Sequence, residues 1–350
     1  MNQSSRPVAT WLLIGVIMII VQIILGGITR LTGSGLSITE WNVVTGVMPP
    51  MNESAWLEEF SKYKTTEQFR QLNSGFTLSD FKFIFFWEWF HRLWGRLIGV
   101  VFLIPFIIFL FQRRFTSSMI KPLVILFLLG ALQGAVGWIM VASGFTGDAV
   151  YVRPTKLALH FVLAMVLLFY TYWFYLQLSV KNESRIGNHS IRNFTWVVLA
   201  VLFIQFFWGA LMAGHRAAAV AYTWPTMNGS FIPREAFNRP EGLISVIENS
   251  FVVHFIHRMI AYTLVILILI LTWMSFRTKT SPAFTKARYF PALFVLVQTT
   301  LGVLTVITSI NIRAYKWNEF EWMAQLHQVV GMLLMLGLVH LLFLAGKKTL

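Results

Sequence analysis

The chain has 350 residues, of which 57% are hydrophobic and only 12% are charged, and it contains no cysteine. A soluble domain carries about 25% charged residues, so the composition excludes an ordinary soluble protein. The lack of cysteine excludes disulfides, covalent haem attachment through Cys-x-x-Cys-His, iron–sulfur clusters and thiolate zinc sites. The formal net charge is +14, but no pattern typical of RNA or DNA binding accompanies it, so we expect no nucleic-acid partner.

Apolar runs dominate the chain. A run of about 20 apolar residues is long enough to cross a bilayer as a helix, and lipid cannot satisfy the backbone of any open structure. The predicted fold class is therefore an all-α integral membrane protein. Its eight predicted transmembrane helices are residues 8–29, 85–111, 120–143, 155–178, 192–214, 250–275, 286–309 and 322–345.

Two long segments, 30–84 and 215–249, connect spans on one side of the membrane, whereas the connections on the other side are short. The polar part of the first segment, from Asn52 to Phe81, is typical of a short amphipathic helix at the membrane interface. This distribution predicts that the function resides on the side with the long loops.

The basic residues predict the orientation. If the N-terminus faces the cytoplasm and the spans alternate, the cytoplasmic segments hold 13 basic residues and one acid, Glu183, while the rest of the chain holds 15 basic and 13 acidic residues. This positive-inside asymmetry predicts that both termini face the cytoplasm. The segment before the first span is too short for a cleaved signal or transit peptide. We therefore expect a multi-pass protein of a bacterial inner (cytoplasmic) membrane, in contact with lipid.

The sequence resembles an internal duplication. Gln22-x-x-x-Gly26 recurs 183 positions later as Gln205-x-x-x-Gly209, and Gln133-x-x-x-Gly137 recurs as Gln298-x-x-x-Gly302. At the offset of 183, Trp41, Gly46 and Pro50 align with Trp224, Gly229 and Pro233. The alternative is chance similarity among apolar helices. The duplication predicts two tandem four-helix bundles related by a pseudo-two-fold axis, residues 1–178 and 192–350, joined by a cytoplasmic linker, 179–191.

Four histidines follow the same repeat, and they lie near the outer ends of the even-numbered spans: His91, His160, His257 and His327. A pair of histidines on neighbouring helices can ligate a b-type haem, and imidazole is costly to bury in lipid without a partner. The alternative for any one of them is a hydrogen bond to a neighbouring backbone. His189, His215 and His340 lack the repeat spacing, and we expect structural or incidental roles for them.

Arg92 and Arg258 each follow a repeated histidine. An arginine near the outer end of a span can pair with a haem propionate, or it can reach the lipid headgroups. Both interpretations remain open from the sequence.

Glu88 breaks the repeat, because it aligns with His254 in the second half. Residues i and i+3 share a helix face, so Glu88 is expected on the face of His91, where a carboxyl group could move a proton or contact a haem edge. The alternative is an acid that stabilises a helix N-terminus.

Over nearly all of its length the sequence resembles the haem A synthase family. The resemblance rests on four segments: Gly-Gly-Ile-Thr-Arg-Leu-Thr-Gly-Ser-Gly-Leu-Ser at 26–37, Glu-Trp-Asn-Val-Val-Thr-Gly at 40–46, Glu-Trp-Phe-His-Arg at 88–92 and Thr-Trp-Pro-Thr-Met-Asn-Gly at 223–229. The long first loop is similar to that of the mitochondrial and proteobacterial branch. Many members carry a cysteine pair in an outer loop, which this chain lacks.

The resemblance implies an enzyme that oxidises the methyl group at ring position 8 of haem O to a formyl group, by successive hydroxylations, giving haem A for cytochrome oxidase. It implies that His257 and His327 ligate a resident haem b, that His91 and His160 hold the substrate haem, and that Glu88 is catalytic. Candidate partners are haem O synthase, cytochrome oxidase assembly factors and further copies of the chain.

Two other classes are considered. A dihaem b-type electron-transfer protein that relays electrons across the membrane would place its haems near opposite faces, whereas all four histidines are predicted near one face. A transporter built on a duplication would have spans broken by Gly or Pro at mid-membrane, whereas these spans are mostly continuous.

Overall fold

The structure is a computed structural model that describes all residues except 1–5, 41–44, 238–241, 313–316 and 348–350. The described residues form helices and loops, with one isolated β-bridge between Met227 and Ser230. Eight helical segments among them are long and apolar enough to cross a membrane, which confirms the predicted number of spans. They are α1 (Arg6–Leu31), α4 (Leu78–Phe111), α5 (Ser117–Ala142), α6 (Pro154–Ser179), α7 (His189–Gly214), α9 (Ser250–Phe276), α10 (Pro282–Ala287) with α11 (Phe290–Thr308), and α12 (Glu319–Ala345).

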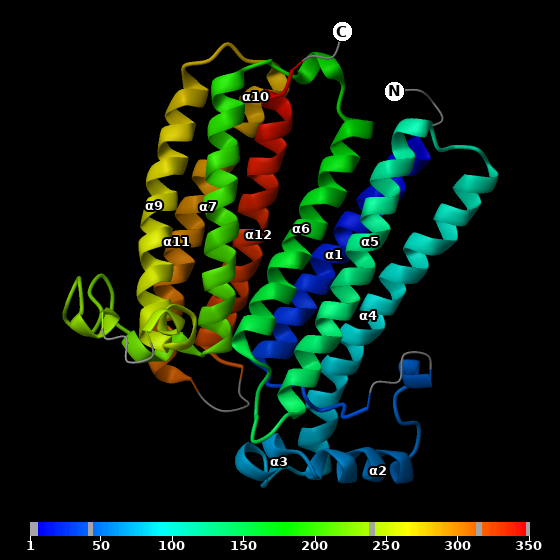
Figure 1. The fold of residues 1–350 in the computed structure, drawn as a ribbon, viewed down its shortest axis with the longest axis vertical. Helices are drawn as coiled ribbons and strands as arrows, with labels where there is room; N and C mark the ends of the chain where they lie inside the picture. The colour runs from blue at the N-terminus through cyan, green and yellow to red at the C-terminus, as the bar shows by residue number, and fades with distance from the viewer. Residues whose placement is uncertain (1–5, 41–44, 238–241, 313–316, 348–350) are drawn as a thin grey trace.

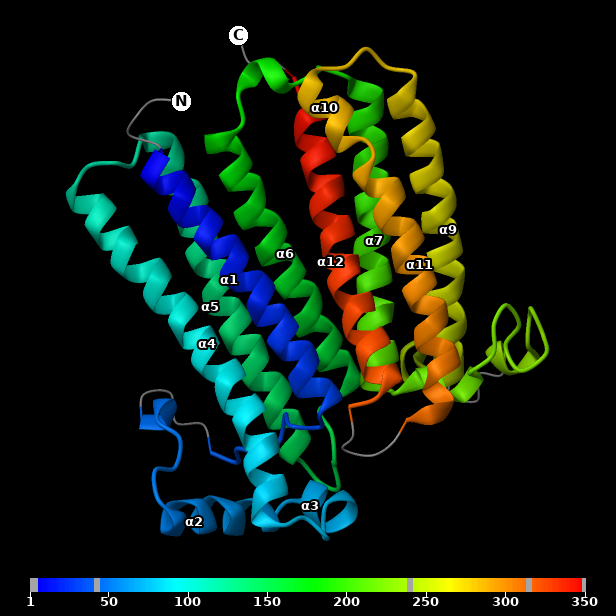
Figure 2. The same cartoon turned by 180° about the vertical axis from the view of Figure 1, so that it is seen from behind.

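The helices lie side by side in two groups of four (Figures 1 and 2). One group contains α1, α4, α5 and α6, and the other contains α7, α9, α11 and α12. The groups meet where α6 packs against α7 and α12, and where α1 packs against α12. This grouping follows the order of the chain; the pseudo-two-fold relation between the groups stays a prediction.

The two ends of the bundle differ. The start of α1, the end of α12 and the connection between α6 and α7 lie at one end, called here the basic end. The short helices α2 (Glu53–Lys64) and α3 (Glu67–Leu72) lie at the other, called here the loop end (Figure 1). His189, predicted in the linker, is the first residue of α7.

The helices at the seam, where the two groups meet, are more buried than the helices at the outer edge of the bundle. In the most apolar stretch of α12, 61% of residues are buried inside the protein, against 0% in α4 and 6% in α5. Apolar side chains that face outward along α4 and α5 suit a lipid environment, because lipid replaces the protein contacts that a soluble helix would need.

The even-numbered spans begin at the loop end with recognisable start signals. Thr77 and Asp80 form a capping box at the start of α4, and Asn318 and Glu321 form one at the start of α12. Pro154 occupies the first turn of α6, where its missing N–H costs nothing. Side-chain caps of this kind satisfy the free N–H groups of the first turn.

The helix α4 is longer than predicted. Its 34 residues begin at Leu78 rather than at 85, and a helix of that length spans roughly 50 Å, more than the hydrocarbon core of about 30 Å. The additional turns pack against α2, where the Phe81 ring stacks on Phe60 and Tyr63 at 5.0 and 5.3 Å. The helix expected between residues 52 and 81 is thus present, as α2 and α3.

We predict the orientation from the charge asymmetry. Reporter domains fused within 180–188 and 278–281, at the basic end, should read as cytoplasmic. Fusions within 62–72 and 230–237, at the loop end, should read as external, because translocating the basic segments is disfavoured. An external signal from 180–188 together with a cytoplasmic one from 62–72 would reverse the assignment.

Candidate functional site: four histidine niches at the loop end

The four predicted histidines lie on α4, α6, α9 and α12, which all start at the loop end. Each side chain is half-buried. An imidazole at such a position is enclosed by helices but keeps one edge open to a ligand.

A glutamine from the neighbouring odd-numbered span contacts each histidine. The Nε2 amide group of Gln22 in α1 donates to Nε2 of His91 at 2.9 Å. The same contact recurs three times, for Gln133 with His160 (3.2 Å to Nδ1 and 3.3 Å to Nε2), Gln205 with His257 (3.3 Å) and Gln298 with His327 (3.3 Å). All four pairs join an odd span to the following even span.

The glycine of each Gln-x-x-x-Gly motif lies one turn further along the same helix and gives the imidazole room. A Cβ atom added at Gly137 would lie 2.7 Å from Cε1 of His160, and one at Gly302 would lie 2.9 Å from Cε1 of His327. A Cβ atom at Gly209 would lie 3.1 Å from Cε1 of His257, and one at Gly26 would lie 3.3 Å from Nε2 of His91. Each histidine ring therefore packs directly against the backbone of a neighbouring helix.

The second pair of histidines is the closer one. The ring centroids of His257 and His327 are 6.4 Å apart, with the ring planes at 70°. Because a metal–imidazole nitrogen bond is about 2 Å long, two imidazoles on opposite sides of one iron have centroids roughly 6 Å apart. For His91 and His160 the described residues include no such ring contact.

The tautomer of His327 is fixed by its backbone contact. Nδ1 of His327 lies 3.1 Å from the carbonyl oxygen of Gln298, to which it donates, so Nε2 carries the lone pair that a metal needs. Near this pair, the buried atoms Oε1 of Gln205, Oε1 of Gln298 and Nδ1 of His257 have no hydrogen-bond partner among the described residues. The ring spacing, the tautomer and the unpaired polar atoms together fit a bis-histidine haem.

The two predicted arginines both hold a loop at the loop end. Arg92 donates to the carbonyl oxygens of Ile38 and Glu40, at 3.2 and 3.3 Å. Arg258 donates to the carbonyl oxygens of Ala221 and Thr223, both at 2.9 Å, and to that of Thr226. At the repeat offset of 183, Ile38 aligns with Ala221 and Glu40 with Thr223, so these contacts follow the repeat register. In the present arrangement these donors serve loop carbonyls; a contact to a propionate stays a prediction.

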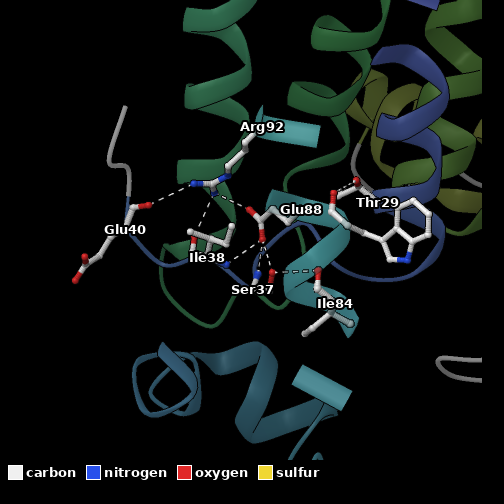
Figure 3. Close-up of polar contacts among 8 residues, drawn as sticks. Thr29, Ser37, Ile38, Glu40, Ile84, Glu88 and Arg92 are labelled. Atoms are coloured by element: carbon white, nitrogen blue, oxygen red, sulfur yellow. Dashed lines mark hydrogen bonds and ion pairs between the residues drawn. The ribbon is translucent and has the colours of Figure 1, made fainter. Parts of the chain in front are cut away.

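Glu88 is buried, with 2% of its surface exposed, and four donors converge on its carboxylate (Figure 3). Oε2 accepts from the backbone N–H and the hydroxyl of Ser37, both at 2.7 Å, and from the N–H of Ile38 at 2.9 Å. Oε1 accepts from Arg92 at 2.6 Å. Glu88 thereby joins α4 to the segment that ends the glycine-rich motif at 26–37, one turn from His91.

His254, the residue of the second half that aligns with Glu88, contacts Arg258, which aligns with Arg92. His254 is fully buried, and its Nε2 accepts from Nε of Arg258 at 3.0 Å. Both halves therefore anchor a loop-end segment through an arginine, and only the first half adds a carboxylate. The tendency of Arg92 to pair with Glu88 in i,i+4 geometry could have been read from the sequence; the bonds to Ser37 and Ile38 span about fifty positions and could not.

The described residues also form a surface cavity of about 340 Å³ between residues 227–235 and Phe251. None of the four histidines lines it, so we do not assign it to the histidine site.

Comparison with known proteins shows the family of the chain. The family model described as cytochrome oxidase assembly protein matches residues 9–339. The chain belongs to this family. Its curated relatives include the heme A synthase of Bradyrhizobium sp. (strain ORS 278), 41% identical over 318 residues, which are 89% of this chain and 86% of the relative.

Two further relatives cover still more of the chain. The heme A synthase of Flavobacterium psychrophilum is 36% identical over 337 residues, 95% of this chain and 96% of the relative. That of Cereibacter sphaeroides (strain ATCC 17023) is 39% identical over 357 residues, 98% of this chain and 88% of the relative. No solved structure matches the chain.

Substitution of a motif glycine tests how closely a histidine ring depends on the neighbouring helix. Gly137→Ala should displace the His160 ring, because the added Cβ would lie 2.7 Å from Cε1, whereas nothing lies within 4 Å of a Cβ at Gly134 on the same helix. Moving a ligand by this much should lower haem affinity at that site about 10- to 100-fold, as loss of a ligand's supporting contacts does. Titration with haem of purified Gly137→Ala, and of Gly134→Ala as its control, measures the effect. Equal affinities would show that the His160 ring does not need the backbone of α5.

Proposed function

We propose that this chain is a haem A synthase, which oxidises the methyl group at ring position 8 of haem O to a formyl group by successive hydroxylations. The observation that carries the proposal is the set of four repeat-related histidines, each held against a Gln-x-x-x-Gly motif at one end of a membrane bundle. The names of the relatives support the same activity.

The second half would hold a resident haem b through His257 and His327. Their ring spacing of 6.4 Å suits one iron between them. When bound, such a haem supplies one-electron transfer. The protein's part is to fix the two rings: the carbonyl of Gln298 orients His327, and Gly209 and Gly302 admit both rings close to the backbone.

The first half would bind haem O through His91 and His160. Their rings are held by α1 and α5, the helices of Gln22 and Gln133. The lack of a ring-to-ring contact within the described residues suits a site that opens for a substrate. α4 and α5 also lie at the outward edge of the bundle, with almost none of their apolar stretches buried, so lipid-dissolved haem O could approach them from the membrane.

Glu88 and Arg92 would act beside the substrate. In the present arrangement Glu88 accepts from four donors and anchors the Ser37–Ile38 segment to α4. A catalytic carboxylate would have to release at least one of these donors to take a proton from a reacting group. The anchored segment would also restrict access of water to the ring edge.

The proposed setting is a bacterial inner membrane, with the histidines towards the outer side. Haem O synthase and cytochrome oxidase assembly factors are the proposed partners, and self-association is also open to test. A dihaem electron-transfer protein without oxidative chemistry is the competing function; all four histidines lie on helices at their loop-end portions, which does not favour a relay across the membrane.

Histidine substitutions test the division of labour. His257→Ala and His327→Ala should remove the haem b spectrum from the purified protein. His91→Ala and His160→Ala should keep that spectrum but abolish conversion, measured as haem A in chromatographed pigment from cells that make haem O. His189→Ala, an exposed side chain at the basic end, is the control. Haem A formation by the His91→Ala, His160→Ala double variant would refute the substrate assignment, and absence of haem A with the wild-type chain would refute the synthase.

The role of Glu88 can be separated from its anchoring contacts. All four hydrogen bonds of the Glu88 carboxylate are donated to it. In Glu88→Gln the amide NH2 group must therefore face a donor. We expect the folded state to lose stability on the order of 3–5 kcal/mol, as for a broken buried ion pair. Ser37→Ala removes one of the four donors and leaves the carboxylate. We expect Glu88→Gln to retain haem b but to accumulate haem O or an alcohol intermediate, and Ser37→Ala to form haem A.

The measurement is haem O, alcohol and haem A per folded protein, with folded protein quantified by the resident haem spectrum. Equal losses of haem A in the two variants would assign Glu88 to anchoring alone.

A further inference from the structure

The amide groups of the four motif glutamines contact ring nitrogens of the histidines, the atoms that would also bind iron. For His91, and for His257 and His327 in the second half, the amide N–H of the glutamine is directed at Nε2 of the imidazole. For His327 this is the nitrogen with the lone pair, since its Nδ1 donates to a carbonyl. The amide and an iron therefore compete for one lone pair.

We propose that Gln22, Gln133, Gln205 and Gln298 are place-holders for haem iron: each uses the lone pair of its histidine until iron takes it. This inference rests on the proposed function, because it assumes that the four histidines ligate haem. A buried imidazole nitrogen without a partner is costly, and the amide removes that cost. Ligation by iron is then an exchange of one partner for another.

A second contact distinguishes the halves. The amide groups of Gln22 and Gln133 also donate to the backbone carbonyl of the same histidine, both at 3.2 Å. For Gln205 and Gln298, which lie wholly within the described part of the chain, no such second bond is present. When iron displaces the amide from the ring, Gln22 and Gln133 keep a partner beside it, whereas Gln205 and Gln298 lose their partner.

This difference suits the proposed roles of the sites. A substrate site must exchange its haem in each cycle, and a retained second bond keeps the amide ready to return to the ring. A resident site exchanges its haem rarely. The oxygen atoms of all four amides, Oε1, are buried and have no partner among the described residues, so within those residues the amides are held by their N–H groups alone.

The test compares the affinity of the first-half site for haem O in variants of the full chain. Gln22→Leu and Gln133→Leu remove the competing donor, so they should bind haem O about 3- to 10-fold more tightly than the wild type, the effect of one net hydrogen bond. Protein stripped of haem should unfold at a lower temperature in both variants, because the imidazole loses its partner. Gln22→Asn, whose amide is too short to reach the ring, provides a second variant should leucine prevent folding.

Gln328→Leu is the matched control. Gln328 lies beside His327 and is a glutamine of a transmembrane helix, but its amide donates to the carbonyl of Ile23 at 2.8 Å and not to a histidine. It should leave haem O affinity unchanged. Weaker or unchanged binding in Gln22→Leu and Gln133→Leu, or in Gln22→Asn if the leucine variants do not fold, would overturn the place-holder role. That outcome is independent of turnover: failure of the proposed function would appear as haem O that the wild type binds but does not convert, or does not bind at all.

Discussion

A buried imidazole within a membrane bundle needs a hydrogen-bond partner, and this requirement organises the structure around the four histidines. Lipid offers no hydrogen bonds, so the partner must come from a neighbouring helix. Here it is a glutamine from the preceding span, and the glycine one turn away lets that span approach closely enough for the contact to form. The packing of α1 on α4, α5 on α6, α7 on α9 and α11 on α12 thus carries both the fold and the site.

The loops at the loop end follow from a second requirement, the satisfaction of backbone carbonyls close to the bundle. Arg92 and Arg258 each bring several N–H donors to a turn of the chain, and a planar guanidinium can serve several carbonyls at once. Glu88 compensates the charge of Arg92, whereas Arg258 has a neutral imidazole, His254, in the equivalent place. The first half therefore has an ion pair one turn from His91 where the second half has an arginine beside a neutral side chain, and this is the local asymmetry on which the two sites can differ.

The sequence predicted the eight spans and the four histidines because both depend on local signals: apolar length, and a residue type that is costly in lipid. It also identified the Gln-x-x-x-Gly repeat, but only as a sign of duplication. The repeat could not reveal that the glutamine meets the histidine, since that contact depends on which faces of two helices meet. The extra turns of α4 were missed because Asp80 and Lys82 interrupt the apolar run there, and because Phe81 packs against α2, which the sequence could not reveal. The bonds from Glu88 to Ser37 and Ile38 are equally long-range in sequence.

The seam between the halves has a polar contact, between α1 and α12, and an apolar one, between α6 and α7. On α12, the amides of Gln325 and Gln328, on either side of His327, donate to the carbonyls of Ile24 and Ile23 on α1. The aligned residues around His160 are Ala158 and Phe161, which pack in an apolar cluster against α7.

The facing helices differ in the same way. Gly27 on α1 is the position at which a Cβ would collide with the Gln325 and Gln328 side chains, and its repeat partner on α7 is Ala210, which is buried in the apolar cluster. Interhelical amide–carbonyl bonds in membranes are worth about 0.6–2 kcal/mol each, so the polar seam is held more specifically than the apolar one. Because the same stretch of α1 carries Gln22, which contacts His91, the polar seam connects the backbone beside the first histidine pair to the residues that flank His327.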